Sequence, residues 1–456
     1  MDNSVLTKGH KIHFIGIGGI SMSALARILM DDGCIVTGSD MKESHITKQL
    51  EEYGAQITIG QSDANITDQD LVVYTAAVKE DNPEFMAAVE KGIEIIDRAE
   101  LLGAIMKRYD NPIAVSGTHG KTSTTGMISQ IFLEADMDPT VTIGGELDVI
   151  GGNLRVGKKE IFIAEACEYH RSFLKFSPKT TVILNIEEDH LDFFTGLDDI
   201  IDTFNRFAHI TPDDGVIVAN ADDKNVLKAL EGVNKRIVTV GIENSCNYKA
   251  CDIKHDALEK YTFKVFKNGS FYTDVALAVP GTHNVYNALC AFAVADLAGI
   301  DKSVICSALG KFIGAHRRFE RKGYFNNALI VDDYAHHPSE INATLTAAKN
   351  MGFKNVYCVF QPHTYTRTKM LFDDFVKVFK ESDVNVIITD IFAAREKDTG
   401  LVSSQDLAQA IESASYIKSF DEVEEYLRDN LSENDLVITM GAGDVYKIGE
   451  NILKLT

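Results

Sequence analysis

The sequence predicts an α/β protein that folds as three domains. Its 456 residues suit three domains of about 150 residues each. Short apolar runs alternate with helix-like runs in the first and last parts of the chain, a pattern typical of parallel sheets covered by helices. Two glycine-rich turns each follow a strand-like run and precede a helix-like run, as in nucleotide-binding α/β domains.

The first domain is expected over residues 1–109 as a Rossmann-like domain. Regular alternation of strands and helices predicts a parallel sheet with helices on its faces. A polar stretch ending in Pro112 marks the boundary. The predicted strands are Lys11–Ile17, Cys34–Thr37 and Leu71–Tyr74, and the predicted helices are Ser21–Met30, Thr47–Tyr53, Pro83–Lys91 and Ala99–Lys107.

The second domain is expected over residues 110–314 as a mixed α/β domain like that of P-loop ATPases. A strand at Ile113–Val115 leads through a glycine turn into a helix at Ser123–Glu134. Further strands are predicted at Ile161–Glu165, Thr181–Ile186 and Gly215–Ala219, shorter polar-alternating strands within Tyr248–Val279, and a helix at Asn284–Ala298.

The third domain is expected over residues 315–456 as a second Rossmann-like α/β domain, because the alternation begins again there. The predicted strands are Ala328–Asp332, Val356–Phe360, Val384–Thr389 and Asp435–Met440, and the helices are Pro338–Lys349, Leu371–Phe379 and Ser404–Ser413.

Composition excludes several classes of protein. The formal net charge of −22 argues against nucleic acid as a partner, because that partner requires a basic face. We find no run of about 18 apolar residues and no signal-peptide core, so we expect no membrane span and a cytoplasmic location. The seven cysteines contain no C-x-x-C pair. We therefore expect neither a disulfide framework nor a zinc–thiolate site.

The first glycine turn, GIGGISMSALA, covers Gly16–Ala26, and Asp40 closes the next predicted strand. This is the setting of a dinucleotide-binding fingerprint, although Ser21 replaces its third glycine. Backbone N–H groups at the start of the helix suit a pyrophosphate. NAD, FAD and nucleotide sugars all carry one, and a tight turn without a ligand is the alternative.

The second glycine turn, VSGTHGKTSTT, covers Val115–Thr125. The usual P-loop has a glycine where this chain has Val115, so the loop is shorter. Gly117 and Gly120 allow the backbone to wrap an anion, Lys121 can reach phosphates, and the hydroxyl of Thr122 suits Mg²⁺. The strand before it and the helix after it favour a phosphate site over a chance match.

Acidic groups and a histidine follow two further predicted strands. Glu165 and Glu168 end one of them, and His190 follows the other. Ligands gather at the carboxyl ends of parallel strands, so Glu165 and His190 are expected near Lys121, with Mg²⁺ as the metal. Each alone is more typical of a solvated loop. Cys167 near His170 lacks a third group to orient it, so no nucleophile is indicated.

The third domain carries a dense polar set after two adjacent strands. One segment runs from Asp332 to Pro338 and the other from Gln361 to Arg367, with Arg317 and Arg318 upstream. Arginine binds carboxylates in a bidentate manner, so a small carboxylate ligand is expected.

Eight motifs cover nearly the whole chain in a fixed order: GIGGISMSALA, SGTHGKTSTT, EACEYH, NIEEDHLDFF, GTHNVYNALCA, GAHRRFE, DDYAHHPSE and QPHTYTRT. Together they resemble the Mur ligase family of peptidoglycan synthesis, in which the shorter GTHGKT loop is the usual form. The resemblance implies a three-domain ligase that uses ATP and Mg²⁺. Its N-terminal domain would bind a UDP-sugar, its central domain ATP, and its C-terminal domain an amino acid.

The resemblance also implies a role for individual residues. The UDP-sugar site would contain Gly18, Gly19, Ser39, Asp40, His119 and Asn185. The ATP site would contain Gly117, Thr118, His119, Gly120, Lys121, Thr122, Ser123, Asn287, Arg318 and Asp333. The Mg²⁺ ligands would be Thr122, Glu165 and His190, and the catalytic groups Lys121, Glu165 and His190. The amino-acid pocket would contain Tyr334, His336, His363 and Arg367.

Several relatives that act later use a carbamylated lysine after the D-H element, and this chain has no lysine between His190 and Lys224. It therefore resembles the members that join L-alanine to the lactyl carboxylate of UDP-N-acetylmuramate through an acyl phosphate. A recycling ligase that adds a preformed peptide to the same sugar is the alternative within the family. A nicotinamide-dependent dehydrogenase and a non-catalytic nucleotide sensor are alternatives of other classes. A monomer or weak homodimer is expected.

Overall fold

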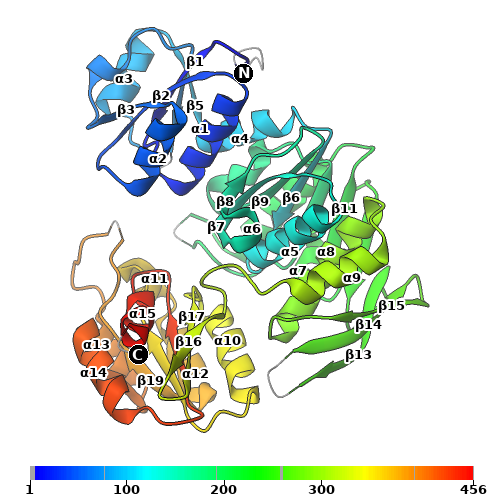
Figure 1. Ribbon diagram of the computed structural model, residues 1–456, viewed down its shortest axis with the longest axis vertical. Helices are drawn as coiled ribbons and strands as arrows, with labels where there is room; N and C mark the ends of the chain where they lie inside the picture. Colours follow the sequence, from blue (N-terminus) through cyan, green and yellow to red (C-terminus); the bar gives the residue numbers. More distant parts are fainter. Residues whose placement is uncertain (1–5, 76–77, 192, 257–259, 395, 455–456) are drawn as a thin grey trace. The chain divides into compact units, whose positions relative to one another are not determined.

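The computed structural model describes residues 6–75, 78–191, 193–256, 260–394 and 396–454 (Figure 1). The chain divides into two compact units, Met1–Tyr248 with Cys290–Ile305 and Lys249–Leu289 with Cys306–Thr456. Asp192 of the NIEEDHLDFF motif and part of the predicted Tyr248–Val279 strand region lie outside the described residues.

The first sheet of the first unit has five parallel strands in the order β3-β2-β1-β4-β5. Apolar side chains of α1, α2 and α4 pack on one face, and α3 packs on the other. Both faces are thus covered, as predicted for a Rossmann-like domain. The strands are β1 (Lys11–Ile15), β2 (Ile35–Asp40), β3 (Gln56–Ile59), β4 (Leu71–Tyr74) and β5 (Glu94–Asp97), and the helices are α1 (Ile20–Asp31), α2 (His45–Tyr53), α3 (Pro83–Glu90) and α4 (Arg98–Met106).

The second sheet of this unit contains strands in the order β12-β11-β10-β6-β9-β7-β8, parallel except for the β7–β8 pair. Its strands are β6 (Asn111–Ser116), β7 (Thr140–Leu147), β8 (Gly152–Arg155), β9 (Ile161–Ala166), β10 (Thr180–Ile183), β11 (Val216–Asn220) and β12 (Ile237–Gly241). Its helices include α5 (Lys121–Glu134), α6 (Leu197–Ile210) and α7 (Lys224–Ala229). The register places the carboxyl ends of β6, β9 and β10 at one edge.

Two details of the central region differ from the predictions. Helix α5 begins at Lys121 rather than Ser123, because Gly120 takes the capping position with a φ of 82°. Strand β10 ends at Ile183 rather than Ile186, and the backbone of the next residues turns toward the glycine loop. The predicted helix at Asn284–Ala298 is present as α8 (Thr282–Leu297), which α9 (Lys302–Lys311) follows. The predicted boundaries fall between α4 and β6 and after α9, and they stay predictions.

In the second unit, β14 (Tyr261–Lys267) and β15 (Ser270–Ala276) form an antiparallel pair beside β13 (Tyr248–His255). A separate six-stranded sheet has the order β16-β17-β21-β18-β19-β20 and is parallel except for β16–β17. Its strands are β16 (Glu320–Phe325), β17 (Ala328–Asp333), β18 (Val356–Phe360), β19 (Asn385–Ile388), β20 (Ala414–Tyr416) and β21 (Leu436–Met440).

Helices cover both faces of this six-stranded sheet. Apolar residues of α10, α12 and α13 pack on one face, and those of α14 and α15 pack on the other. The three helices predicted for this domain are therefore present as α10, α12 and α13, and α11, α14 and α15 were not predicted. The bounds are α10 (Pro338–Asn350), α11 (Tyr365–Met370), α12 (Phe372–Ser382), α13 (Ser404–Ala410), α14 (Phe420–Asn430) and α15 (Tyr446–Leu453).

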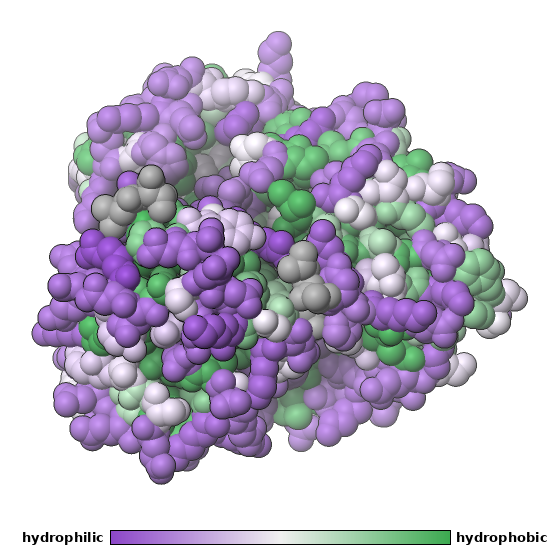
Figure 2. Space-filling view, turned by 60° about the horizontal axis from the view of Figure 1, so that its bottom comes forward, coloured by the Kyte–Doolittle hydropathy of each residue, from purple (hydrophilic) through white to green (hydrophobic). Residues whose placement is uncertain are grey.

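The molecular surface is largely hydrophilic on the face that Figure 2 shows, with hydrophobic residues in small areas between polar ones. This character agrees with the net charge of −22. Among the described residues, no helix combines the length and apolar character needed to cross a membrane.

Candidate active site

The glycine loop between β6 and α5 depends on two glycines in the left-handed region. Gly117 has a φ of 143° and Gly120 a φ of 82°. A Cβ added to Gly117 would lie 2.8 Å from Cβ of Leu184, so another residue there would displace the segment that follows β10. The chain can therefore make the short turn that the sequence predicted, with Val115 as part of the strand.

The residues after β10 hold this loop in place. The Asn185 side chain accepts a hydrogen bond from the backbone N–H of His119 at 2.8 Å and donates to its carbonyl at 3.1 Å. The backbone N–H of Thr118 donates to the Asn185 carbonyl at 3.0 Å, and the Glu187 N–H donates to the Thr118 hydroxyl at 2.9 Å. Strand and loop thus form one hydrogen-bonded assembly.

Lys121 lies under the loop at the first position of α5. Its ammonium donates to the carbonyl of Thr118 at 3.0 Å and lies 3.2 Å from the Glu168 carboxylate. Burial is the largest single effect on Lys121 and acts to lower its pKa, but the charge and hydrogen bond of Glu168, together with other neighbouring acidic groups, outweigh burial and raise the pKa. Lys121 therefore carries a positive charge within reach of any anion that the loop binds.

The start of α5 presents backbone N–H groups that no side chain caps. Thr122 at this end is buried, and Ser123 follows it. Backbone N–H groups at a helix start are a common site for phosphate. The loop, the helix start and Lys121 together form the arrangement expected of a nucleotide phosphate site.

Glu165 lies near the carboxyl end of β9 and His190 follows β10, the strands on either side of β6, and each contacts different groups. The Glu165 carboxylate accepts a hydrogen bond from the backbone N–H of Gly144 at 2.8 Å. His190 adopts a φ of 52° and stacks on the ring of Tyr169, with centroids 4.4 Å apart. Its Nε2 lies 3.9 Å from Oε1 of Glu168. The Mg²⁺ ligands named from the resemblance stay a prediction.

Glu168 is a group at this edge for which we predicted no role. It is buried, contacts both Lys121 and His190, and joins Cys167 and His190 in a cluster whose ligand atoms lie within 4.8 Å of one another. Its position after the strand in EACE was a visible signal, but its pairing with Lys121 depends on the fold. Burial and the Glu168 charge raise the pKa of Cys167 to about 11, which favours the protonated thiol when no metal is bound.

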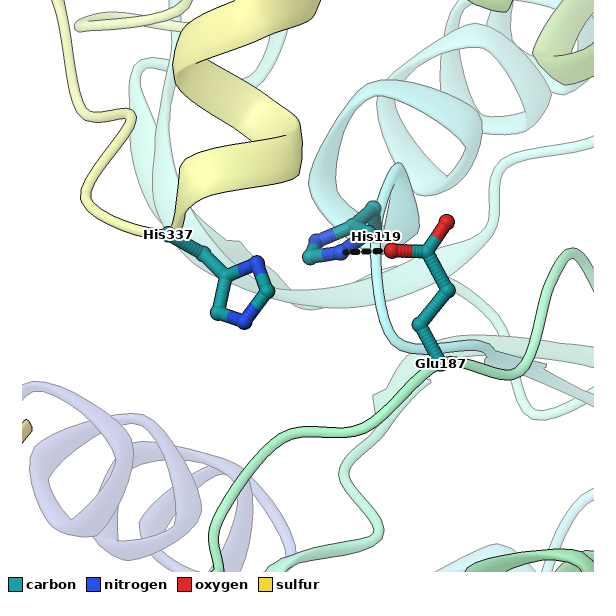
Figure 3. A group of neighbouring side chains, drawn as sticks. All are labelled: His119, Glu187 and His337. Carbon is teal, nitrogen blue, oxygen red and sulfur yellow. Dashed lines mark hydrogen bonds and ion pairs between the residues drawn. The ribbon is translucent and has the colours of Figure 1, made fainter. Parts of the chain in front are cut away.

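His119 projects from the loop between its two glycines. Its Nε2 lies 3.3 Å from Oε2 of Glu187, and Figure 3 shows this ion pair as a dashed line. Glu187 follows β10, so this pair is a further link between the loop and the strand end.

The first glycine turn brings its predicted residues together. Gly16 has a φ of 82°, and the N–H groups of Gly16 and Ile17 donate to the carbonyl of Ser39 at 2.8 and 2.9 Å. The Gly18 N–H donates to the Asp40 carboxylate at 2.9 Å. Gly19 forms the cap of α1. The turn and the end of β2 thus form one surface at the carboxyl edge of the first sheet.

Ser39 differs from its neighbours because it is fully buried. Its hydroxyl donates to Glu84, a fully buried residue in the first turn of α3, at 2.6 Å. Asn65 also donates to Glu84 at 2.5 Å, and His13 Nε2 lies 3.5 Å away. Burial acts to raise the pKa of Glu84, but hydrogen bonds from His13, Asn65 and Ser39 together outweigh it and lower the pKa. A buried anion, absent from the sequence predictions, therefore supports the end of β2.

Asp333 in the second unit is also buried. Its carboxylate accepts hydrogen bonds from the N–H groups of Ala335 at 2.7 Å and Phe319 at 2.9 Å. Burial raises the pKa of Asp333 to about 6, although Arg318 and the two N–H groups act in the opposite direction. Arg318 lies over the ring of Tyr334 at 5.3 Å.

The four residues predicted for the amino-acid pocket form a continuous chain of contacts. The rings of Tyr334 and His336 have centroids 5.5 Å apart, and those of His336 and His363 are 6.0 Å apart. The Arg367 guanidinium donates to Nδ1 of His363 at 3.3 Å. Burial, with His336 and Arg367 nearby, lowers the pKa of His363 to about 4, so this imidazole is neutral at pH 7.

Two further groups support this pocket, and sequence reasoning gave neither a role. Arg317 donates to Asp332 at 2.9 Å and to the carbonyl of Gly441 at 2.6 Å, which ties the ends of β17 and β21 together. Glu396 accepts a hydrogen bond from the N–H of Tyr365 at 2.6 Å and so fixes the start of α11. Arg317 was visible beside Arg318, whereas Glu396 had no signal in the sequence.

Asn287, predicted to contact adenine, is buried on α8 and donates to the side chain of Asn284 at 2.9 Å. Its contact with a nucleotide stays a prediction.

Models of three Mur ligase domains match successive parts of the chain. The catalytic domain model of the Mur ligase family matches residues 11–110, the Mur ligase middle domain matches residues 115–295, and the glutamate ligase domain of Mur ligases matches residues 317–443.

Curated relatives match over almost the entire length. The UDP-N-acetylmuramate–L-alanine ligase of Caldanaerobacter subterraneus subsp. tengcongensis is 51% identical over 453 residues, which cover 98% of each chain. The protein of the same name from Acetivibrio thermocellus is 53% identical over 449 residues, covering 97% of this chain and 95% of the relative.

Solved structures share the fold. The crystal structure of a UDP-N-acetylmuramate-alanine ligase from Thermotoga maritima has a TM-score of 0.81 at 31% identity and 98% coverage of both chains. A murein peptide ligase from Psychrobacter arcticus has a TM-score of 0.71 at 28% identity, again over 98% of both chains. Three domain models in the family's order and relatives of more than 50% identity along the chain lead to one conclusion: this chain belongs to the Mur ligase family.

Proposed function

We propose that this chain is an ATP-dependent ligase that joins L-alanine to the lactyl carboxylate of UDP-N-acetylmuramate, a step in building peptidoglycan precursors. The observation that carries the proposal is the identity of 51% and 53%, over at least 97% of this chain, to relatives named for that reaction. The glycine loop with Lys121 supplies the phosphate site that an ATP-dependent ligase needs.

ATP would bind with its phosphates over the loop of residues 117–120. The backbone N–H groups at the start of α5 and the charged ammonium of Lys121 would hold the β- and γ-phosphates. When ATP binds, Lys121 would turn from Glu168 toward the phosphates. The charge of Lys121 would then reduce the repulsion between the γ-phosphate and an approaching carboxylate.

Mg²⁺ belongs to the proposal, and the donor atoms at this edge suit it. Thr122 offers a hydroxyl oxygen, Glu165 on β9 a carboxylate, and His190 after β10 an imidazole. Oxygen donors are the ligands that Mg²⁺ prefers. A bound Mg²⁺ would neutralise charge on the phosphate oxygens.

The UDP-sugar would bind at the first glycine turn, where the N-terminus of α1 and Asp40 meet. Phosphorylation of its lactyl carboxylate by ATP would give an acyl phosphate, and the amine of L-alanine would displace the phosphate. Arg367 is positioned to hold the alanine carboxylate, since its guanidinium lies beside the two pocket histidines. With a pKa of about 4, His363 is a weak base, which favours His336 as the acceptor of the amine proton.

The decisive experiment is a coupled ADP-release assay with UDP-N-acetylmuramate and a panel of amino acids, with products identified by mass. The expected result is ADP release that requires both UDP-N-acetylmuramate and L-alanine. Release with a preformed tripeptide instead would identify a recycling ligase. A nicotinamide absorbance change without ADP release would indicate a dehydrogenase, and ATP binding without turnover would indicate a nucleotide sensor.

The proposal also includes a cytoplasmic location, where ATP and UDP-sugars are present, and a monomeric or weakly dimeric state. Sedimentation of the purified chain over a range of concentrations tests the second point. A tight oligomer at all concentrations would contradict it.

A further inference from the structure

A mixed set of metal-binding side chains lies beside Lys121. The thiol of Cys167, the carboxylate of Glu168 and the imidazole of His190 each offer one ligand atom, and these atoms lie within 4.8 Å of one another. Cys167 and Glu168 directly follow β9, and His190 follows β10, so the ends of the two strands that flank β6 supply the three groups. We propose that these three residues form a site for a thiophilic divalent cation such as Zn²⁺, and that this cation inhibits the enzyme.

The donor chemistry selects the kind of metal. Sulfur, nitrogen and carboxylate oxygen together suit Zn²⁺ and Co²⁺, whereas Mg²⁺ prefers oxygen ligands and does not use a thiolate. Zn²⁺ bonds of about 2.0–2.3 Å in a tetrahedron place neighbouring ligand atoms about 3.3–3.8 Å apart. His190 Nε2 and Glu168 Oε1 are already 3.9 Å apart. Side-chain movements of about 1 Å or less would therefore bring the three ligand atoms to the distances of a tetrahedral Zn²⁺ site.

The surroundings fix two of the three donors before a metal arrives. Tyr169 stacks on the imidazole of His190, with the two ring planes 29° apart. Glu168 is buried, with 2% of its surface exposed. A site whose ligands are already ordered loses less conformational entropy on binding. The sequence indicated no zinc–thiolate site because no two cysteines have the required spacing, whereas the fold supplies a single thiolate with two other donors.

Lys121 determines when the site is available. Its ammonium lies 3.2 Å from Glu168, so a cation must displace it from that carboxylate. The thiophilic cation and Lys121 thus compete for Glu168. On binding, the Cys167 thiol releases its proton to water as the thiolate coordinates the metal.

The inhibitory part of the inference rests on the proposed function. There, His190 is a ligand of Mg²⁺. A Zn²⁺ ion that takes His190 and Glu168 removes one ligand from the Mg²⁺ set and leaves a second divalent charge where the phosphates bind. Submillimolar Zn²⁺ is then expected to inhibit turnover in the presence of excess Mg²⁺.

Binding is tested without turnover, with Co²⁺ as the probe. A thiolate ligand gives Co²⁺ a charge-transfer absorption in the near ultraviolet, so the full chain is titrated with Co²⁺ in the presence of Mg²⁺. We expect one equivalent to produce the band, Zn²⁺ to remove it, and Cys167→Ser and Cys167→Ala to abolish it. Cys251→Ser, which changes a half-buried cysteine on β13, is the matched control and should keep the band.

Absence of the band from the unaltered chain, or its persistence in both Cys167 variants, would overturn the site. Thermal melting of each variant verifies that it is folded. If one of the two Cys167 variants does not fold, the other still provides the test. His190→Gln should weaken Co²⁺ binding at least tenfold.

Inhibition is measured by ADP release. Cys167 contacts no substrate in the proposed reaction, so Cys167→Ser should keep basal turnover and raise the inhibitory Zn²⁺ concentration at least tenfold. Equal inhibition of the variant and the unaltered chain would contradict the inhibitory role. If no substrate combination releases ADP, the proposed function fails, and the Co²⁺ band still decides whether the site exists.

Discussion

The side chain of Asn185 holds the backbone of His119 by two hydrogen bonds, one accepted from its N–H at 2.8 Å and one donated to its carbonyl at 3.1 Å. Asn185 lies just after β10, and His119 lies in the glycine loop. One amide side chain therefore sets the distance between the loop and the neighbouring strand end, and this relationship leads to the first prediction.

Asn185→Ala should raise the KM for ATP roughly tenfold, because two backbone groups of the loop lose their partners. Asn185→Asp should raise it less, since a carboxylate still accepts from the His119 N–H. Steady-state kinetics at saturating UDP-N-acetylmuramate measure both. Asn205→Ala is the control. Asn205 lies on α6, away from the loop, and its side chain also donates to a backbone carbonyl, that of Ala229, at 2.8 Å. Equal KM values for both alanine variants would contradict a role in shaping the loop.

Lys121→Ala should reduce ADP formation by roughly 10²-fold or more, because the charge that faces the transferred phosphate is lost. Binding of UDP-N-acetylmuramate, measured by calorimetry, should persist, since the first glycine turn belongs to another sheet. Lys228→Ala, which removes an exposed lysine on α7, should have no effect. Near-normal turnover of Lys121→Ala would show that the ATP site is elsewhere.

Arg367→Ala should raise the KM for L-alanine about tenfold or more and leave the KM for ATP nearly unchanged, since it removes a charged partner of the alanine carboxylate. Lys369→Ala changes an exposed residue on the same short helix and is the matched control. A rise of the same size in both KM values would refute the assignment of the pocket.

Glu84→Gln should raise the KM for UDP-N-acetylmuramate roughly tenfold and leave the KM for ATP unchanged. The reason is that Glu84 holds Ser39, whose carbonyl fixes the N–H groups of the first glycine turn. Val72→Ala weakens the core under the same helix without touching these hydrogen bonds. If the two variants lose equal thermal stability and show the same KM values, Glu84 supports only the fold.

Asp333 gives a prediction about pH. Its pKa rises from 3.8 to about 6 on folding, so the folded state binds the proton more tightly than the unfolded state. The stabilisation from this group is full below about pH 4 and is lost as the pH rises through about 6, with an upper limit of about 3 kcal/mol.

The melting temperature of the unaltered chain minus that of Asp333→Asn should therefore fall between pH 4 and pH 7. Melting curves at intervals of half a pH unit measure this difference. A constant difference, or one that grows with pH, would show that Asp333 is not protonated in the folded protein within this range.

The strongest signals in the sequence were local ones, and they predicted the framework well. Strand β4 is a continuous apolar run and β1 is largely apolar, and the glycine loop indicates both the strand before it and the helix after it. Weak elements escaped prediction: β3 is a largely exposed four-residue edge strand, and α14 is mainly polar. Strand β3 is too exposed to show an alternating pattern, and α14 buries only Val423, Glu424 and Leu427 among its eleven residues.

Site residues were predictable where a short local motif indicates their chemistry, as the Gly120-Lys121 pair indicates phosphate binding. The partners of such residues were not, because Glu168 is 47 positions from Lys121 and Glu84 is 45 from Ser39. A buried carboxylate and a solvated one look alike in a sequence, and only the fold separates them.

The backbone at Gly117 also bears on drug resistance. Its φ of 143° and the 2.8 Å approach that an added Cβ would make to Leu184 exclude every other amino acid at this position. An inhibitor that draws its affinity from the main chain of this loop would contact atoms that point mutations cannot replace. Bacteria that depend on such an enzyme would then have few routes of escape through this part of the molecule.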